Sequence, residues 1–176
     1  LRDSEDKLAR KDAELALSDR VFVASSFTRQ SLVDHFGDEL DISVVPYGCP
    51  IPKVDQAARR EPGEPLRLLY AGHLSQRKGI ADLIAALNQL EIDWCLTLAG
   101  PRPVEAPAAL DRFLADPRCE WLGVVPHASL LAQRKDHHAF VCPSLGEGVG
   151  MVITAALAAG LPLIRTPSTA GPDSGL

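Results

Sequence analysis

The sequence has no long apolar run and no excess of positive charge. Its apolar stretches all fall short of the roughly 18 to 20 residues that a membrane-spanning helix needs, and its first ten residues are rich in charge, unlike a signal peptide. The 18 basic residues are outnumbered by 23 acidic ones, for a formal net charge of −5. This balance gives the chain as a whole no electrostatic reason to bind nucleic acid or an anionic membrane. We therefore predict a cytoplasmic protein with no nucleic-acid partner and no transmembrane segment, and peripheral membrane contact stays open.

Cysteine is also scarce, and the sequence has no Cys-x-x-Cys pair. The four residues are widely spaced, at Cys49, Cys95, Cys119 and Cys142. Three of them lie in apolar, strand-like surroundings, so we predict reduced thiols in the core rather than disulfides or metal ligands. His137 and His138 are adjacent, but consecutive side chains project in different directions and no third ligand is spaced nearby. The sequence therefore predicts no bound metal.

From residue 66 onward, short apolar runs rich in β-forming residues alternate with stretches of helical periodicity. Hydrophobic residues make up 46% of the 176-residue chain, which is enough for the core of one domain. The expected strands are residues 66–70, 94–99, 119–122, 139–142 and 161–165, and the expected helices are residues 79–90, 108–114, 128–133 and 150–159. The first helix has one apolar face, formed by Ile80, Leu83, Ile84 and Leu87. Such alternation predicts an α/β fold with a doubly wound, Rossmann-like parallel sheet.

The residues before Pro50 have a different organisation. A charged amphipathic helix up to about residue 17, a strand at residues 21–24, a helix that begins at Ser25 and Ser26, and a strand at residues 42–45 amount to one and a half β-α units. Residues 52–65 contain three prolines and few large apolar side chains, which is typical of a linker. We therefore divide the chain into residues 1–49, a linker at residues 50–65 and a main domain at residues 66–176.

The segment from Ala71 to Gly79 joins the first strand of the main domain to its first helix. In an open α/β sheet, ligands bind beyond the carboxyl ends of the strands, where helix N-termini present unpaired N–H groups and partial positive charge. Arg77 and Lys78 precede the helix, and cations at that end oppose the helix macrodipole unless an anionic ligand offsets them. A phosphate site is one interpretation, and solvated loop cations are the other. The segment is not a P-loop, because G-x-x-x-x-G-K-[ST] is absent.

A second strand-to-helix junction, from Pro143 to Met151, contains three glycines within five residues. Glycine permits positive φ and close approach of the backbone to a ligand. Glu147 is the only charged residue here and has two interpretations: it caps the following helix, or it accepts hydrogen bonds from sugar hydroxyls while the N–H groups after it face phosphate. A dinucleotide fingerprint is disfavoured, because Met151 stands where G-x-G-x-x-G requires its last glycine.

Residues 123–127 form a third junction, between a strand and a short helix. Their backbone offers donors and acceptors that suit a flat base, and an ordinary turn is the alternative interpretation.

Taken together and in this order, the junctions resemble glycosyltransferase family 4, the large retaining family with the GT-B fold. Residues 24–28 (ASSFT) and 42–48 (ISVVPYG) resemble the end of the family's N-terminal domain and its hinge. Residues 70–79 (YAGHLSQRKG) are similar to its phosphate-contacting loop, and residues 98–100 and 122–126 to its next landmarks. Residues 143–150 (PSLGEGVG) and 156–162 (ALAAGLP) resemble its signature segment. The match runs almost from end to end.

The resemblance implies a role for each junction. Arg77 and Lys78 would contact the diphosphate of a nucleotide-sugar donor, Glu147 its sugar, and Val124 its base. The remaining contacts would come from residues that act mainly through their backbone: Gly72, His73, Gly148, Val149, Gly150 and Met151. The implied reaction is transfer of a sugar from a nucleotide-diphosphate sugar to a hydroxyl acceptor with retention. It would need no cofactor and no divalent metal, because the two cations stabilise the departing diphosphate.

The sequence departs from the family pattern at two positions. Ala155 stands eight residues after Glu147, where the family has a second glutamate that holds ribose hydroxyls. His73 stands where many relatives have arginine, and an imidazole makes a weaker phosphate contact. The chain also holds only the final pieces of an acceptor domain and stops before the last strand and helix of the sheet. We therefore expect a fragment that does not catalyse transfer by itself.

Two other classes of protein stay open. A degenerate, non-catalytic GT-B relative would keep the fold as a nucleotide-binding or partner-binding module, and Ala155 is its best support in the sequence. An unrelated doubly wound protein, such as a sugar-nucleotide epimerase or a receiver-like domain, is the third class. A receiver needs paired acidic residues at the end of its first strand, where this chain has Tyr70, Ala71 and Gly72.

Overall fold

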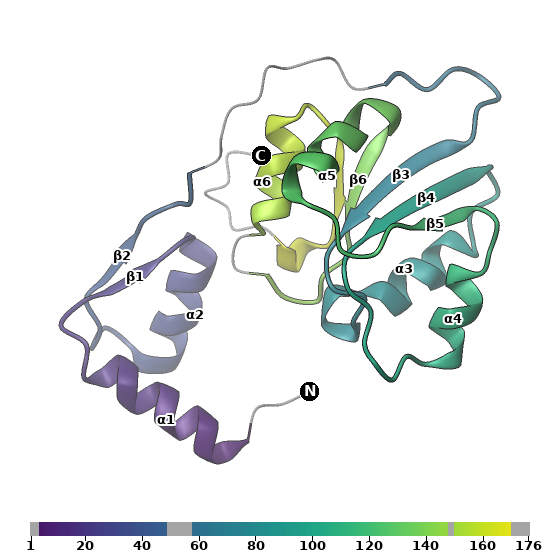
Figure 1. The fold of residues 1–176 in the computed structure, drawn as a ribbon. Helices are drawn as coiled ribbons and strands as arrows, with labels where there is room; N and C mark the ends of the chain where they lie inside the picture. Colours follow the sequence, from purple (N-terminus) through teal and green to yellow (C-terminus); the bar gives the residue numbers. More distant parts are fainter. Residues whose placement is uncertain (1–3, 49–57, 148–149, 170–176) are drawn as a thin grey trace. The chain divides into compact units, whose positions relative to one another are not determined.

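The computed structural model describes residues 4–48, 58–147 and 150–169. The chain divides into two compact units, one that ends at Tyr47 and one that runs from Gly48 to Thr169 (Figure 1). The first half of the linker that the sequence predicts at residues 50–65 lies outside the described residues.

The first unit contains two helices and two strands: α1 (Glu5–Ala16), β1 (Val21–Val23), α2 (Ser26–Phe36) and β2 (Ile42–Val44). β1 and β2 pair in parallel, and Ser25 begins α2 by accepting a hydrogen bond from Thr28 N at 3.2 Å. All four elements lie where the sequence predicts them, to within two residues at most ends. Of the described residues in this unit, only Val23 and Ser25 are buried.

The second unit is built on a sheet of five parallel strands. They are β3 (Leu66–Ala71), β4 (Trp94–Ala99), β5 (Cys119–Trp121), β6 (Ala139–Cys142) and β7 (Leu163–Arg165), in the order β5-β4-β3-β6-β7. The chain therefore adds β4 and β5 on one side of β3, then returns to add β6 and β7 on the other. This is a doubly wound sheet, and the predicted fold class is confirmed.

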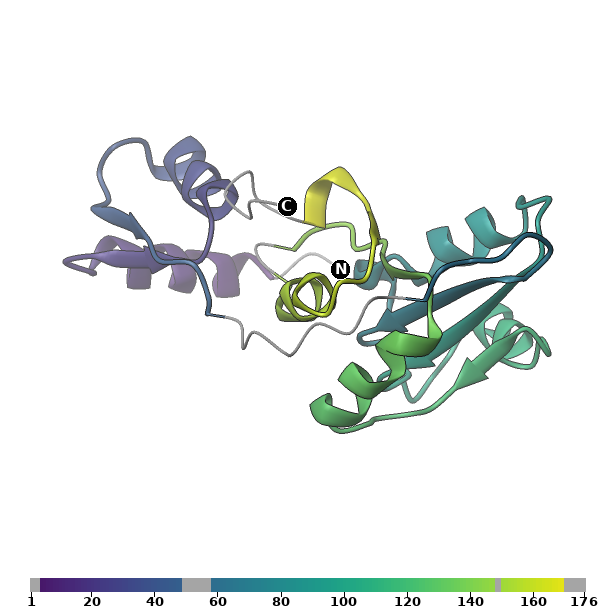
Figure 2. The same cartoon turned by 90° about the horizontal axis from the view of Figure 1, so that it is seen from above.

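Helices cover both faces of this sheet. The helical segments of the unit are η1 (Gln76–Lys78), α3 (Ile80–Leu87), α4 (Ala108–Leu114), α5 (His127–Gln133), η2 (Arg134–Asp136), α6 (Met151–Ala158) and η3 (Pro167–Thr169). α3 and α4 pack on one face, and α5 and α6 pack on the other. In the view of Figure 2, α3 (teal) and α5 (green) lie on opposite sides of the strands.

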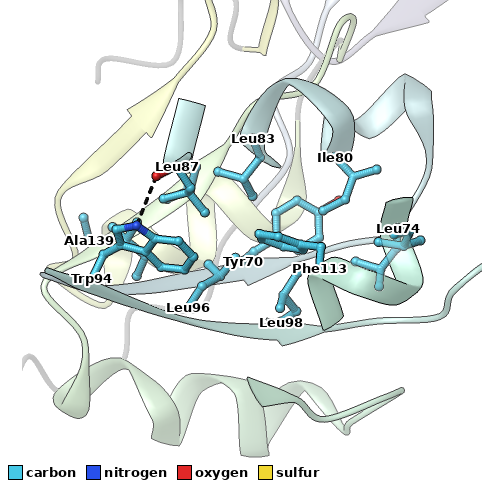
Figure 3. Close-up of a cluster of buried hydrophobic side chains, with 13 residues drawn as sticks. Tyr70, Leu74, Ile80, Leu83, Leu87, Trp94, Leu96, Leu98, Phe113 and Ala139 are labelled. Carbon is cyan, nitrogen blue, oxygen red and sulfur yellow. Dashed lines mark hydrogen bonds between the residues drawn. The ribbon is translucent and has the colours of Figure 1, made fainter. Parts of the chain in front are cut away.

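Alternation along the strands supplies a core on each face. Leu68 and Tyr70 belong to the core on the α3 and α4 side, where Figure 3 shows Tyr70, whereas Leu69 between them packs toward α6. On the α3 and α4 side, Trp94 is almost fully buried and its Nε1 donates a hydrogen bond to Leu87 O at 3.1 Å. Burial of each large apolar side chain of this kind contributes about 1.5 to 3 kcal/mol. The two cores fix the strand ends on which the site is built.

Two elements of this unit differ from the prediction by more than one residue at one end. The helix expected at residues 79–90 begins at Ile80, because Gly79 has a φ of 69° and cannot be part of a right-handed helix, and it ends at Leu87. The strand expected at residues 161–165 begins at Leu163. Leu161 instead takes part in the C-terminal cap of α6, which ends at Ala158. Gly160 turns the chain at a φ of 76°, and the N–H of Leu161 then donates to Ala156 O at 3.0 Å.

The described cysteines are free, as predicted, but they are not all in the core. Cys142 is buried, whereas Cys95 and Cys119 are partly exposed, and Cys49 lies outside the described residues. In the part of the chain that the structure describes, no helix is both long enough and apolar enough to cross a bilayer.

Candidate functional site

The two charged junctions meet at the carboxyl edge of the sheet, where β3 and β6 are neighbours. Chain winding reverses between these two strands, which creates the crevice where open α/β sheets bind their ligands. Residues 72–79 follow β3 and residues 143–147 follow β6. The site hypothesis requires these two loops to share one edge of the sheet, and they do.

The loop after β3 is held by hydrogen bonds to buried groups. Gly72 N donates to Ala99 O at 2.9 Å, and the Tyr70 hydroxyl donates to His73 O at 3.0 Å. Burial raises the pKa of Tyr70 above its usual range, and the nearby Cys142 and Glu147 raise it further, so the hydroxyl keeps the proton that it donates. Tyr70 therefore fixes the position of the loop from the core of the sheet, and the sequence did not reveal this role.

The loops after β3, β4 and β5 lie against one another through glycine. Gly100 has a φ of 138°, and a Cβ at this position would overlap the carbonyl oxygen of Gly72. Gly100 N donates to Gly123 O at 2.7 Å, and Trp121 Nε1 donates to Gly100 O at 3.0 Å. The glycine at position 100 thus lets the loops after β3 and β4 approach each other closely.

Arg77 and Lys78 directly precede the N-cap of α3, as the sequence predicted. They lie in the separate 3-10 turn η1, and Gly79 stands between that turn and the helix in a left-handed conformation. Because Gly79 is the N-cap of α3, both cations stand directly before the amino end of this helix, where positive charge opposes the macrodipole unless an anion offsets it. Gly79 also packs against the second loop, because a Cβ there would overlap the carbonyl oxygen of Pro143.

Lys78 and Glu147 are paired with each other. Lys78 Nζ donates to Glu147 Oε2 in a short charge-assisted hydrogen bond, and each side chain is only 17% exposed. Leu145 N also donates to Arg77 O at 3.0 Å, so the two loops are joined through their backbones as well. The residues predicted to contact a donor's phosphate and sugar therefore occupy one place, on adjacent loops.

Ser144 is a third member of this group, and it carried no assigned role in the sequence. Its side chain is 1% exposed, and its Oγ donates to the same carboxylate oxygen of Glu147 at 3.2 Å. The Thr166 hydroxyl, in the loop after β7, donates to the backbone oxygen of Ser144. Sequence spacing does not indicate the contact with Thr166, because that contact depends on the neighbouring positions of β6 and β7 in the sheet.

Within the described residues, the other predicted contact residues form no hydrogen bond or ion pair with the side chain of Lys78 or Glu147. Arg77 and His73 are exposed, Val124 is 76% exposed beyond β5, and Met151 is 65% exposed in the first turn of α6. Gly150 is the residue before α6. Gly148 and Val149 lie outside the described residues. The roles of these residues toward a ligand stay predictions.

Ala155 faces the protein interior. It is 5% exposed and lines a small apolar cavity with Leu69, Phe140, Val152 and Leu161, among others. Thr154 is no replacement for a ribose-binding carboxylate, because its hydroxyl donates to Met151 O at 2.9 Å within the same helix. At the position where the family pattern has a second glutamate, this chain thus has an apolar side chain, Ala155, in apolar surroundings.

The two adjacent histidines make structural hydrogen bonds. His137 Nε2 lies 2.9 Å from Thr97 Oγ1 and its Nδ1 lies 2.6 Å from Gln133 O, while His138 Nδ1 accepts a hydrogen bond from Arg67 N at 3.0 Å. Across the described ranges, no three His, Cys, Asp or Glu side chains are grouped so that they could hold a metal ion. The expectation of metal-free chemistry stays a prediction.

A doubly wound parallel sheet with a charged pair at its switch point is the arrangement of a Rossmann-like domain with a ligand site. The family model described as "Glycosyl transferases group 1" matches residues 65–175, and the chain belongs to this family. A glycogen synthase of Mycobacterium tuberculosis is 34% identical over 157 residues, which cover 85% of this chain and 37% of that protein. The chain therefore spans less than two fifths of the length of this relative.

Solved structures share the fold. Sucrose-phosphate synthase of Thermosynechococcus elongatus superposes with a TM-score of 0.78 at 23% identity, over 96% of this chain and 45% of that one. The Anabaena protein HepE, in a complex with UDP and glucose, superposes with a TM-score of 0.74 at 18% identity, over 95% of this chain and 50% of that one. At this level of identity the likeness shows the GT-B architecture alone.

Proposed function

We propose that this chain binds the nucleotide-diphosphate-sugar donor of a glycosyltransferase that passes the sugar to a hydroxyl acceptor with retention. The observation that carries the proposal is the meeting of Lys78 and Glu147 at the switch point between β3 and β6. Membership of the glycosyl transferases group 1 family supports sugar transfer, and the HepE complex with UDP and glucose supports a nucleotide-linked donor.

Each residue of the site has a role that follows from its charge and position. Lys78 and Arg77 contact the diphosphate, and the backbone of Gly72, His73 and residues 148–151 supplies further contacts to phosphate and sugar. Glu147 accepts hydrogen bonds from the donor sugar, and Val124, exposed beyond β5, lies against the base. A carboxylate is a suitable partner for sugar hydroxyls because it is an acceptor at both oxygens.

The chemistry that these residues assist is a substitution at the anomeric carbon. The bond from that carbon to the phosphate oxygen breaks, a bond to the acceptor oxygen forms on the same face of the sugar, and the acceptor's proton leaves with the nucleoside diphosphate. Negative charge grows on the diphosphate as it departs, and fixed cations stabilise that charge in a site of low exposure. We therefore propose that Lys78 and Arg77 act in place of a divalent metal. The relatives are more than twice as long, and we expect these 176 residues alone to bind donor without transferring sugar.

Calorimetric titration tests donor binding directly. UDP-, GDP- and ADP-sugars are titrated into the protein in the presence of a metal chelator, and we expect saturable binding of at least one of them. Lys78→Ala and Glu147→Ala should each weaken that binding about ten- to hundredfold, because each removes a hydrogen bond to a charged group. Lys135→Ala, which removes an exposed cation from η2, is the matched control and should bind as the wild type does.

A degenerate, non-catalytic relative is the second candidate, and the apolar surroundings of Ala155 favour it. Such a module would keep the fold without using Lys78 and Glu147 on a donor. Binding that neither substitution changes, or no binding of any nucleotide sugar, would support this candidate over the first.

A further inference from the structure

Lys78 and Glu147 are hydrogen-bonded to each other in the structure. The ammonium group that the proposed function assigns to phosphate is held by the carboxylate that it assigns to the sugar. We propose that donor binding exchanges these partners, and that Ser144 is the positioning residue that keeps Glu147 in place once phosphate has taken Lys78. This inference rests on the proposed function and adds to it a competition inside the site.

The exchange follows from the shared acceptor atom. Glu147 Oε2 accepts hydrogen bonds from both Lys78 Nζ and Ser144 Oγ. A phosphate at Lys78 would stand beside this carboxylate, and two anions repel each other strongly at a site of low exposure. This repulsion favours release of Lys78 by the carboxylate when phosphate arrives, and the Ser144 hydroxyl is then the remaining hydrogen-bond partner of Glu147 among the described residues.

Ser144 is held in a way that suits this role. It is almost fully buried, and Thr166 fixes its backbone oxygen from the loop after β7, which contains none of the proposed ligand contacts. Cys142 Sγ lies 3.8 Å from Ser144 Oγ. The single hydroxyl proton of Ser144 points to Glu147, so the thiol must be the donor in that contact. Burial raises the pKa of Cys142, and the thiol therefore keeps its proton.

The exchange predicts opposite effects on two ligands that differ only by the sugar. A nucleoside diphosphate needs Lys78 but gains nothing from Glu147, which competes for the same cation. A nucleotide sugar needs both residues in place. Removing the negative charge of Glu147 should therefore favour the diphosphate, whereas removing the Ser144 hydroxyl should weaken only the contribution of the sugar.

The test compares the affinities of UDP and UDP-glucose by calorimetry, or of the GDP or ADP pair if that base is the one the wild type binds. Glu147→Gln should bind the nucleoside diphosphate about tenfold more tightly than the wild type, since it removes the internal competitor. Ser144→Ala should bind the nucleotide sugar about tenfold more weakly and leave diphosphate affinity unchanged. Ser129→Ala, which removes an exposed hydroxyl from α5, is the control and should change neither affinity.

A second variant covers the case in which Ser144→Ala does not fold. Thr166→Val removes the hydroxyl that fixes Ser144 and should weaken nucleotide-sugar affinity alone, and Thr166→Ser should restore it. If the Ser144 and Thr166 variants lost affinity equally for both ligands, Ser144 would have only a structural role. If Glu147→Gln bound the nucleoside diphosphate as tightly as the wild type does, or more weakly, the competition would be excluded. Both outcomes require a wild type that binds; a wild type that binds neither ligand overturns the proposed function instead.

Discussion

Gly79 joins the two halves of the site because only a glycine fits there. Its φ of 69° lies in the left-handed region, and a Cβ would overlap the carbonyl oxygen of Pro143 in the loop after β6. The close approach brings η1, which carries Lys78, against the loop that carries Glu147. The geometry of the ion pair therefore depends on the absence of one methyl group.

Gly79→Ala should destabilise the protein by more than backbone strain alone explains. Positive φ costs an alanine about 1 kcal/mol, and overlap with Pro143 should raise the loss to about 3 kcal/mol. Gly123→Ala is a matched control, because Gly123 has a φ of 67° in the same unit and open space around its Cβ position. Urea unfolding of both variants measures the difference. Equal losses would show that the contact with Pro143 has no energetic consequence.

Sequence reasoning brought Lys78 and Glu147 to the same edge of the sheet, since strand-to-helix junctions of a parallel sheet share that edge. It did not foresee that the two side chains bind each other, or that Tyr70, Ser144 and Thr166 support them. Those contacts depend on which strands are neighbours and on side-chain directions, and neither is encoded in local spacing. The prediction that Arg77 and Lys78 precede α3 is confirmed, whereas their 3-10 turn and the left-handed Gly79 were not predicted.

At the scale of elements, β3 and β6 begin their pairing through a histidine side chain. Arg67 N donates to His138 Nδ1 at 3.0 Å, and His138 N donates to Arg67 O at 2.8 Å. Because Nδ1 accepts, the imidazole is neutral and its proton lies on Nε2, which is buried 3.8 Å from Glu64 Oε2 without a hydrogen-bond partner. Protonation at Nδ1 would replace this acceptor by a donor that faces another N–H group.

The stability of the second unit should therefore fall as the solution becomes acidic. Burial lowers the pKa of His138 below its ordinary 6.5, and Arg67, Arg60 and His137 act in the same direction while Glu64 opposes them. The unfolded chain then binds a proton that the folded chain excludes, so stability is full above about pH 6.5 and is lost progressively below it.

His138→Gln tests this origin of the pH dependence, because the glutamine oxygen can still accept from Arg67 N but does not titrate. Free energies of unfolding in urea at pH 7, 6 and 5 should decline less steeply for this variant than for the wild type. His73→Gln, which removes an exposed imidazole, should keep the slope of the wild type. Parallel slopes for His138→Gln and the wild type would assign the acid sensitivity to other groups.

The order of the elements was predictable because each strand and helix carries its own periodicity. α4 agrees with its expected range at both ends, and its apolar Leu110 and Phe113 point into the core. The observed boundaries differ from the predicted ones where a single residue with positive φ begins or ends an element, as at Gly79 and Gly160. The sequence predicted a doubly wound parallel sheet but not the order of its strands, since periodicity alone does not say which strands are neighbours.

At the scale of the whole molecule, ligand binding and stability are linked through the second unit. The loops of Lys78 and Glu147 both belong to it, and so do the two tryptophans of the chain, Trp94 and Trp121. Tryptophan emission therefore follows the unfolding of the unit that carries the proposed donor site. A ligand that binds only the folded form stabilises it by RT ln(1 + [L]/Kd).

A nucleotide sugar at one hundred times its Kd should raise the unfolding free energy measured by tryptophan emission by about 2.7 kcal/mol. A Lys78→Ala variant that binds tenfold more weakly should gain only about 1.4 kcal/mol at the same concentration, whereas Lys135→Ala should gain as much as the wild type. Each gain is taken relative to the same variant without ligand, because loss of Lys78 also leaves Glu147 without its cation and lowers the starting stability. If Lys78→Ala gained the full 2.7 kcal/mol, the ligand would be binding without this cation, and the switch point between β3 and β6 would not be the phosphate site.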